Sequence, residues 1–248
     1  MINLKEIWMK EENYAFSGWD FSHLNGRQEY DPLPWDYRTE AVKDLAPAHH
    51  LLDMGTGGGE FLMTLGHPCE NTAVTEGYPP NLALCREKLA PLGVQVVGAD
   101  GEDALPFANE TFDRVINRHE SYIPSEVFRI LKPGGRFVTQ QVGGKNCFDL
   151  RERLGFVVPE NQFDLEHEVA QFESAGFRIL RAEEHFNKLR FFDAGAVVFH
   201  AKIIQWEFPG FSVEKNWDQL MDIQREIEAC GCIECTEHRF LIAAKKEI

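Results

Sequence analysis

The sequence has no long, uninterrupted run of apolar residues. Its longest candidate, residues 194–204, is interrupted by His200 and Lys202, whereas a helix that spans a bilayer needs about 20 apolar residues. The first residues, MINLKEIWMKEENY, also lack the apolar segment behind a basic one that a secretory signal peptide has. We therefore expect no membrane-spanning helix and a cytoplasmic location.

The sequence is also short of basic residues. Lys and Arg total 25 and Asp and Glu total 40, so the formal net charge is −15. Domains that bind nucleic acids usually carry a basic patch or stripe, and no dense cluster of Lys and Arg occurs here. The composition therefore disfavours a nucleic-acid substrate, and we expect no nucleic-acid partner.

The six cysteines do not form the framework of a small secreted domain, and a chain of 248 residues with 44% hydrophobic residues needs none. Cys230, Cys232, Cys235 and His238 stand close together, and three thiolates with an imidazole can bind zinc. Their spacing, C-x-C-x-x-C-x-x-H, is not that of paired zinc knuckles, and His238 opens a predicted strand. We therefore expect that these residues bind no metal, and a zinc site is the alternative.

The stretch that carries most of the chemistry is residues 50–61, HLLDMGTGGGEF. A short apolar segment ends at Asp53, glycines follow at 55, 57, 58 and 59, and a helix is predicted from there. Glycine allows a sharp turn and the close approach of a ligand to the backbone. The helix N-terminus adds free amides and a positive dipole end. The pattern predicts a strand, a tight turn and a helix that hold a nucleotide-type ligand.

The spacing of these glycines distinguishes two cofactors. The dinucleotide fingerprint is G-x-G-x-x-G, and Glu60 occupies the position of its last glycine. The observed pattern, D-x-G-x-G-x-G, resembles motif I of the class I S-adenosylmethionine-dependent methyltransferases. An NAD(P)-dependent oxidoreductase and a non-catalytic module that binds S-adenosylmethionine for regulation stay as alternatives.

Three later features extend the resemblance over residues 35–143. Glu76 ends a predicted strand 19 residues beyond Gly57, where an acid can accept hydrogen bonds from both ribose hydroxyls. Residues 100–107, DGEDALPF, are similar to the segment that holds adenine in these enzymes, and LKPGGRF at 131–137 is another of their features. Four features in the right order are more specific than any one of them. The chain looks like a bacterial enzyme of the methyltransferase type 11 kind.

The resemblance implies an α/β fold with a Rossmann-like seven-stranded sheet, mostly parallel with the last strand antiparallel. Helices lie on both faces, and a helical insert precedes the last strand. We predict strands over 50–54, 72–75, 94–97, 112–117, 136–142, 176–180 and 238–245. Helices are predicted over 37–45, 59–65, 81–89, 126–131 (capped by Ser125), 145–175 with a break at 155–159, 193–206 and 213–229.

We expect one methyltransferase domain over residues 1–248. Its parts are a cover segment (1–48), a core (49–183), a helical insert over the active site (184–237) and the final strand (238–248). The cover segment is rich in aromatic residues, namely Trp8, Tyr14, Phe16, Trp19, Phe21, Trp35 and Tyr37. Most are expected to cover a sheet edge, and Trp35, Asp36 and Tyr37 are also candidates for a lid over the cofactor.

The implied cofactor is S-adenosyl-L-methionine, and the implied partner is a small-molecule methyl acceptor. The residues expected to bind the cofactor are Asp53, Gly55, Thr56, Gly57, Glu76, Gly77, Tyr78, Asp100, Gly101, Glu102, Asn117 and Arg118. Arg118 is a candidate for holding the methionyl carboxylate or a substrate acid.

Methyl transfer is an in-line displacement in which the cofactor carries the activation and the protein supplies position. A base is needed only when the acceptor is protonated at working pH. His119 follows the strand 112–117 and is the first candidate for that base, although a structural histidine fits the position equally well. Glu120, Tyr122, His185 and His200 are weaker candidates.

Motifs that the sequence lacks narrow the substrate. No D/N-PP-Y follows the strand 112–117, which disfavours methylation of the adenine amino group. No Pro-Cys pair follows it either, which disfavours the covalent route to cytosine, and nothing resembles the double-acid loop of arginine methyltransferases. The acceptor atom stays open among O, N, C and S.

Overall fold

A computed structural model describes residues 3–16, 21–157 and 163–247. It contains two compact units, which are considered one at a time. The core unit is Pro34–Gly143, Gln162–His185 and Arg239–Ile248, and the second unit is Met1–Leu33, Gly144–Asn161 and Phe186–His238. Two strands, β7 (Phe177–Phe191) and β8 (Ile233–Lys246), have residues in both units.

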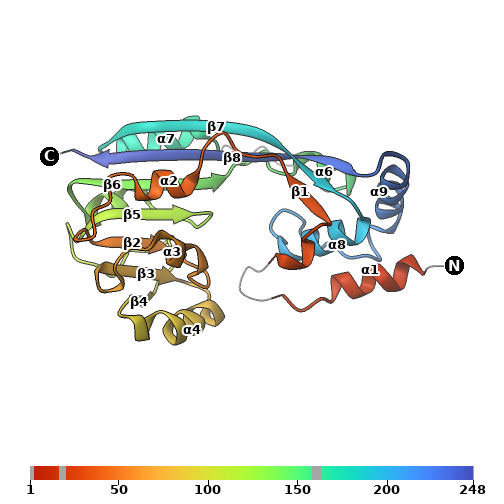
Figure 1. Ribbon diagram of the computed structural model, residues 1–248. Helices are drawn as coiled ribbons and strands as arrows, with labels where there is room; N and C mark the ends of the chain where they lie inside the picture. The colour runs from red at the N-terminus through yellow and green to blue at the C-terminus, as the bar shows by residue number, and fades with distance from the viewer. Residues whose placement is uncertain (1–2, 17–20, 158–162, 248) are drawn as a thin grey trace. The chain divides into compact units, whose positions relative to one another are not determined.

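The core unit is built on parallel strands that run side by side (Figure 1). They are β2 (Leu51–Met54), β3 (Thr72–Glu76), β4 (Gln95–Gly98), β5 (Phe112–Arg118) and β6 (Leu131–Val142). β8 pairs antiparallel with β6. The prediction of a mostly parallel sheet with an antiparallel last strand is confirmed.

Within the described residues, the sheet has eight strands rather than the predicted seven, in the order β1-β7-β8-β6-β5-β2-β3-β4. The additional strand is β1 (Gln28–Tyr30), which pairs antiparallel with the last residues of β7. It comes from the predicted cover segment, where three residues are too few to show an alternating pattern.

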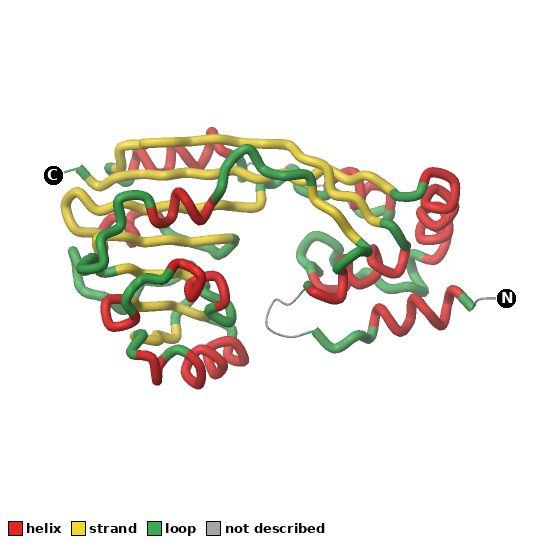
Figure 2. The backbone as a smooth tube through the Cα atoms, in the orientation of Figure 1, coloured by secondary structure: helices red, strands yellow, loops and turns green. Residues whose placement is uncertain are grey.

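Helices flank the sheet of the core unit, and most of them follow one of its strands (Figure 2). They are α2 (Tyr37–Val42), α3 (Glu60–Leu65), α4 (Pro79–Lys88), α5 (Pro124–Ile130) and α7 (Leu165–Ser174). In the view of Figure 1, α2 and α3 lie in front of the sheet and α7 behind it. Apolar side chains such as Leu52, Val115, Phe137 and Phe172 fill the core between these layers.

Two local predictions in the core unit are wrong. Ser125 does not cap a helix, because α5 begins one residue earlier at Pro124, and Ile123 is its N-cap without a side-chain bond. Proline suits the first helical position because its φ is already fixed there. The strand predicted over 136–142 begins earlier, at Leu131, so the KPGG segment belongs to β6, and Gly134, with φ of +82°, accompanies a register shift against β5.

β7 is longer than predicted and continues to Phe191, so residues 184–191 are strand rather than helical insert. Residues 186–191 alternate between exposed and more buried positions, the two-residue period of a strand. The helices predicted after this point exist with shorter bounds, as α8 (Ala194–Ile203) and α9 (Trp217–Cys230).

The second unit has its own apolar core around α8, which is buried from Ala194 to Ala201. A helix that is apolar all round is a buried helix, which accounts for the apolar run seen in the sequence. α1 (Leu4–Glu12) lies against α8 (Figure 1), and the rings of Trp8 and Trp217 pack at a tilt of 55° with centroids 5.1 Å apart.

The remaining elements of this unit are η1 (Ser22–Leu24), β1 and α6 (Phe148–Arg153). Several aromatic residues of the predicted cover segment therefore pack within the second unit, among them Phe16 and Phe21, which are partly buried against its apolar core. Trp19, and Pro159 in the predicted helix break, lie outside the described residues. No helix in the described part of the chain combines the length and apolarity needed to cross a membrane.

Candidate functional site

The glycine turn after β2 has the conformation that its sequence predicts. Gly55, Gly57 and Gly59 have φ of +66°, +63° and +82°, values that residues with a side chain adopt only under strain. Glu76, at the end of β3, accepts hydrogen bonds from the backbone N–H of Gly57 at 2.8 Å and of Tyr78 at 2.9 Å. Each carboxylate oxygen has a further lone pair available for a ligand hydroxyl.

Asp53 lies at the start of the same turn and is only 5% exposed. Its Oδ2 accepts a hydrogen bond from the Thr56 hydroxyl at 2.7 Å. Burial raises the pKa of Asp53 from 3.8 to about 7, and the negative charge of Glu76 adds to the increase, whereas Thr56 and Arg118 oppose it. An ionised Asp53 is therefore costly in this environment unless a cation comes near.

The loop after β5 lies directly against the glycine turn and also against the segment after β4. A Cβ placed on Gly55 would lie 2.5 Å from Cβ of Glu120, and one on Gly101 would lie 1.7 Å from the carbonyl oxygen of Ser121. Burial, followed by the charge of Glu76, raises the pKa of Glu120. The fold thus brings three acids from three strand ends, Asp53, Glu76 and Glu120, to one turn.

The segment after β4 completes this edge of the sheet. A Cβ on Gly77 would lie 2.8 Å from Cβ of Asp100, and Asp100 Oδ1 accepts the backbone N–H of Glu102 at 3.0 Å. The Ser121 hydroxyl donates to Glu102 Oε1 at 3.3 Å. The residues predicted after β2, β3, β4 and β5 are therefore neighbours at the carboxyl ends of the parallel strands, where ligands bind in open α/β sheets.

Asn117, at the end of β5, is buried within the protein's own polar network. Its Oδ1 accepts hydrogen bonds from the Thr139 hydroxyl at 3.0 Å and from Gln141 Nε2 at 2.6 Å. The Tyr37 hydroxyl donates to its carbonyl oxygen at 2.9 Å. Asn117 therefore holds the end of β5 in place, with two donors already on its amide oxygen.

Arg118 and His119 follow, and both are exposed. The guanidinium carbon of Arg118 lies 4.4 Å from the ring centroid of Phe61, a cation–π contact. His119 has φ of +65°, an uncommon conformation for a residue with a side chain that is often found at functional sites. Its backbone N–H donates to the carbonyl oxygen of Gln140 at 2.9 Å.

A chain of side-chain hydrogen bonds fixes the proton of His119. Trp35 Nε1 donates to Gln140 Oε1 at 2.8 Å, and an indole nitrogen can only donate. Gln140 therefore turns its oxygen to Trp35 and its Nε2 to His119 Nε2, 3.1 Å away. Since an amide nitrogen donates, His119 Nε2 is the acceptor, and the neutral imidazole carries its proton on Nδ1.

The electrostatic surroundings favour the same neutral form. Although solvent reaches His119, desolvation by the surrounding protein lowers the pKa of its imidazole well below the ordinary value, and the positive charges of Arg239 and Arg118 lower it further.

The side chain of Gln140 was missed as a site residue. Its signal in the sequence is the polar run TQQ after the apolar Phe137 and Val138, near the carboxyl end of the strand.

The weaker candidates for a base lie in different surroundings. Tyr122 donates to Glu168 at 2.6 Å and packs edge-on against the ring of Phe137. His200 is buried in the second unit, 3.9 Å from the sulfur of Cys147. His185 lies on β7 in the core unit.

The Cys230, Cys232, Cys235 and His238 set does not converge on one point. Cys230 ends α9 and is exposed, whereas Cys235 is buried on β8, where burial raises the pKa of its thiol. His238 Nδ1 accepts the backbone N–H of Lys145 at 3.1 Å. Within the described ranges, no three His, Cys, Asp or Glu side chains are arranged to hold a metal.

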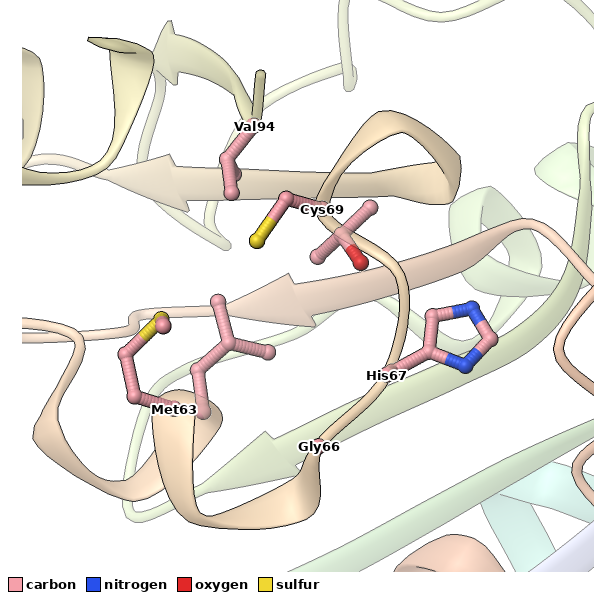
Figure 3. A pocket seen from close by; sticks show the side chains of 7 residues that line it. Met63, Gly66, His67, Cys69 and Val94 are labelled. Carbon is pink, nitrogen blue, oxygen red and sulfur yellow. The ribbon is translucent and has the colours of Figure 1, made fainter. Parts of the chain in front are cut away.

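A small cavity near α3 is unrelated to these residues. Met63, His67 and Cys69 are among those around it (Figure 3), together with Thr72 at the start of β3. Its volume is about 30 Å³, enough for about two water molecules. It lies at the opposite end of β3 from Glu76, so it is not the site of a nucleoside.

Comparison with known proteins finds that the chain is similar to methyltransferases. Residues 52–139 match the family model described as a methyltransferase domain. The chain is 35% identical over 142 residues to 2-methyl-6-phytyl-1,4-hydroquinone methyltransferase 1 of rice, which covers 52% of this chain and 43% of that protein. It is 34% identical over 119 residues to sterol 4-C-methyltransferase strm-1 of Caenorhabditis elegans, covering 43% and 35%. The chain thus spans less than half the length of these curated relatives.

A solved structure of a candidate methyltransferase from Bacillus halodurans has the same fold. Its TM-score is 0.58 at 17% identity, over 86% of this chain and 99% of that one. At this identity the likeness concerns the fold alone.

Proposed function

Because residues 52–139 belong to the class I S-adenosylmethionine-dependent methyltransferases, we propose that the protein transfers a methyl group from S-adenosyl-L-methionine to a small-molecule acceptor. The observation that carries the proposal is the acidic glycine turn, with Glu76 bonded to Gly57 and with Asp53 and Glu120 beside it. The names of two relatives, which describe a hydroquinone and a sterol as acceptors, support a small molecule.

The residues of the strand ends fit the parts of the cofactor. Glu76 has free lone pairs for the ribose hydroxyls. Asp100 and Glu102 with nearby backbone amides suit adenine, and the exposed guanidinium of Arg118 suits the methionyl carboxylate. Gly55, Thr56, Gly57, Gly77, Tyr78 and Gly101 supply the backbone against which the cofactor lies. We assign Asn117 to the same site as a residue that holds the end of β5.

The charge at the turn fits a cationic ligand. S-adenosylmethionine supplies a methyl group activated by a positively charged sulfonium. Burial raises the pKa values of Asp53 and Glu120, and the negative charge of Glu76 raises both further. A positive charge beside them relieves that repulsion. The cofactor is therefore expected to bind more tightly as Asp53 ionises near pH 7.

His119 suits the acceptor side as a hydrogen-bond donor better than as a base. Its Nε2 already accepts from Gln140, and Nδ1 carries the proton and makes no hydrogen bond with the described residues. A base would need an unprotonated nitrogen facing the acceptor. We assign His119 Nδ1–H to orienting the acceptor, and acceptors that lose their proton readily to water fit this site best.

The test is a transfer assay with methyl-labelled cofactor and small acceptors that include a hydroquinone and a sterol. The proposal expects label in a small organic product. Label that appears only in added protein or nucleic acid would contradict it. Binding of the cofactor without transfer to any class of acceptor would favour the regulatory module, and reduction of NAD(P) would favour the oxidoreductase.

A further inference from the structure

A second cavity, of about 130 Å³, lies in the core unit, at the ends of β5 and β6 opposite to the glycine turn. Four cationic side chains line it, from Lys43, Arg114, Arg136 and Arg181, together with the acid Glu40. Arg114 and Arg136 are register partners on neighbouring parallel strands. Like charges placed directly opposite each other in a sheet are destabilising, so this pair needs compensation.

Carboxylates compensate only part of this charge. Arg136 pairs with Asp44 at 2.9 Å, and Arg181 pairs with Glu40 and with Glu183. In the described part of the chain, neither Lys43 nor Arg114 has a carboxylate within ion-pair distance. The acid that lines the cavity is therefore already engaged, and among the described residues two of the four cations, Lys43 and Arg114, have no carboxylate partner.

Arg114 is 3% exposed, and its guanidinium is only partly satisfied. Nη1 donates to the carbonyl oxygen of Ala41 at 2.7 Å, and Nη2 donates to that of Lys43 at 2.6 Å, at the C-terminal end of α2. Its Nε has no hydrogen-bond partner in the described part of the structure. Burial, with the charge of Arg136 beside it, lowers the pKa of Arg114 to about 10, which leaves it charged at neutral pH.

We propose that this cavity binds a small tetrahedral oxyanion of the phosphate type. Such an ion accepts hydrogen bonds at several oxygens, so it satisfies the free Nε of Arg114 and lies between the charges of Lys43 and Arg136. The cavity volume of about 130 Å³ would hold several water molecules, each of which needs about 10–15 Å³, so it has room for one such ion. The site is at the opposite ends of the strands from the cofactor residues, and the proposal does not depend on the methyltransferase assignment.

The test is calorimetric titration of the whole protein with inorganic phosphate and, separately, sulfate, at an ionic strength held constant with potassium chloride. Saturable binding of one ion per chain is expected. Arg114→Lys keeps a charge but removes the guanidinium, Nε included, and it should weaken phosphate binding about tenfold or more. Arg225→Gln alters an exposed arginine of the second unit and should leave binding unchanged.

Lys43→Gln provides the same test without disturbing the bonds to α2, and it decides the matter if Arg114→Lys does not fold. It should also weaken phosphate binding. Absence of saturable heat with the unmodified protein would overturn the proposal, and so would equal affinities in the unmodified protein and Lys43→Gln. Saturating S-adenosylhomocysteine should not displace the phosphate, and displacement would place the ion in the cofactor site instead.

Discussion

Replacing Asp53 with Asn should stabilise the folded protein at pH 8. The side chain is 5% exposed, and burial raises its pKa from 3.8 to about 7. At about 1.4 kcal/mol per pKa unit, the ionised carboxylate costs at most about 4 kcal/mol in the folded state. Asparagine is neutral and keeps an oxygen for the Thr56 hydroxyl, so the variant avoids this cost.

The sign of the pH dependence follows from the raised pKa. The folded protein holds the Asp53 proton more tightly than the unfolded chain, so its stability falls as the pH rises from about 4 to about 7 and then levels off. The advantage of Asp53→Asn should therefore be roughly half as large at pH 5.5 as at pH 8. Urea unfolding of both proteins at the two pH values measures it.

Asp113 provides a control, because its pKa is shifted in the opposite direction to that of Asp53. Although partial burial acts against it, hydrogen bonds from Lys132 and from the backbone N–H of His50 lower the pKa of Asp113. Asp113→Asn should therefore lose stability at pH 8. The reasoning is refuted if Asp53→Asn is no more stable than the original protein at pH 8, or if its gain is the same at both pH values.

Three further predictions concern the site. Glu76→Ala removes the acceptor of the Gly57 amide and should weaken cofactor binding at least tenfold by calorimetry; unchanged affinity would end its assignment. His119→Ala should lower turnover and leave cofactor affinity largely intact, and full activity would remove His119 from the mechanism. ¹⁵N NMR should find His119 neutral with its proton on Nδ1 at pH 7. Trp35→Phe frees Gln140 to rotate and should mix the two tautomers, so an unchanged spectrum would contradict the hydrogen-bond chain.

The cofactor edge could be predicted from sequence because its signals are local. The strand before Asp53, the glycine turn and the acid at Glu76 each occupy a few consecutive residues. Their approach to one another follows from the rule that parallel strands share a carboxyl edge. The protonation of His119 was beyond reach, because it depends on Trp35, which contacts Gln140 across 105 residues of sequence.

The second unit also could not be predicted from local sequence patterns. Its core joins Trp8 near the start of the chain to Phe199 on α8 and Leu220 on α9, and no pattern within one segment indicates such a combination. The burial of residues 186–191 alternates with a period of two, but their sequence, FNKLRF, does not, because the apolar Phe186 is exposed and the polar Asn187 is buried. β1 has three residues, too few for any periodicity to show.

Calorimetric titration with S-adenosylmethionine, S-adenosylhomocysteine and NAD in parallel identifies the cofactor. The acidic glycine turn predicts saturable binding of the first two compounds and none of NAD. Binding of NAD alone would contradict the assignment of the glycine turn, and binding of none of the three would contradict the assignment of a working cofactor site.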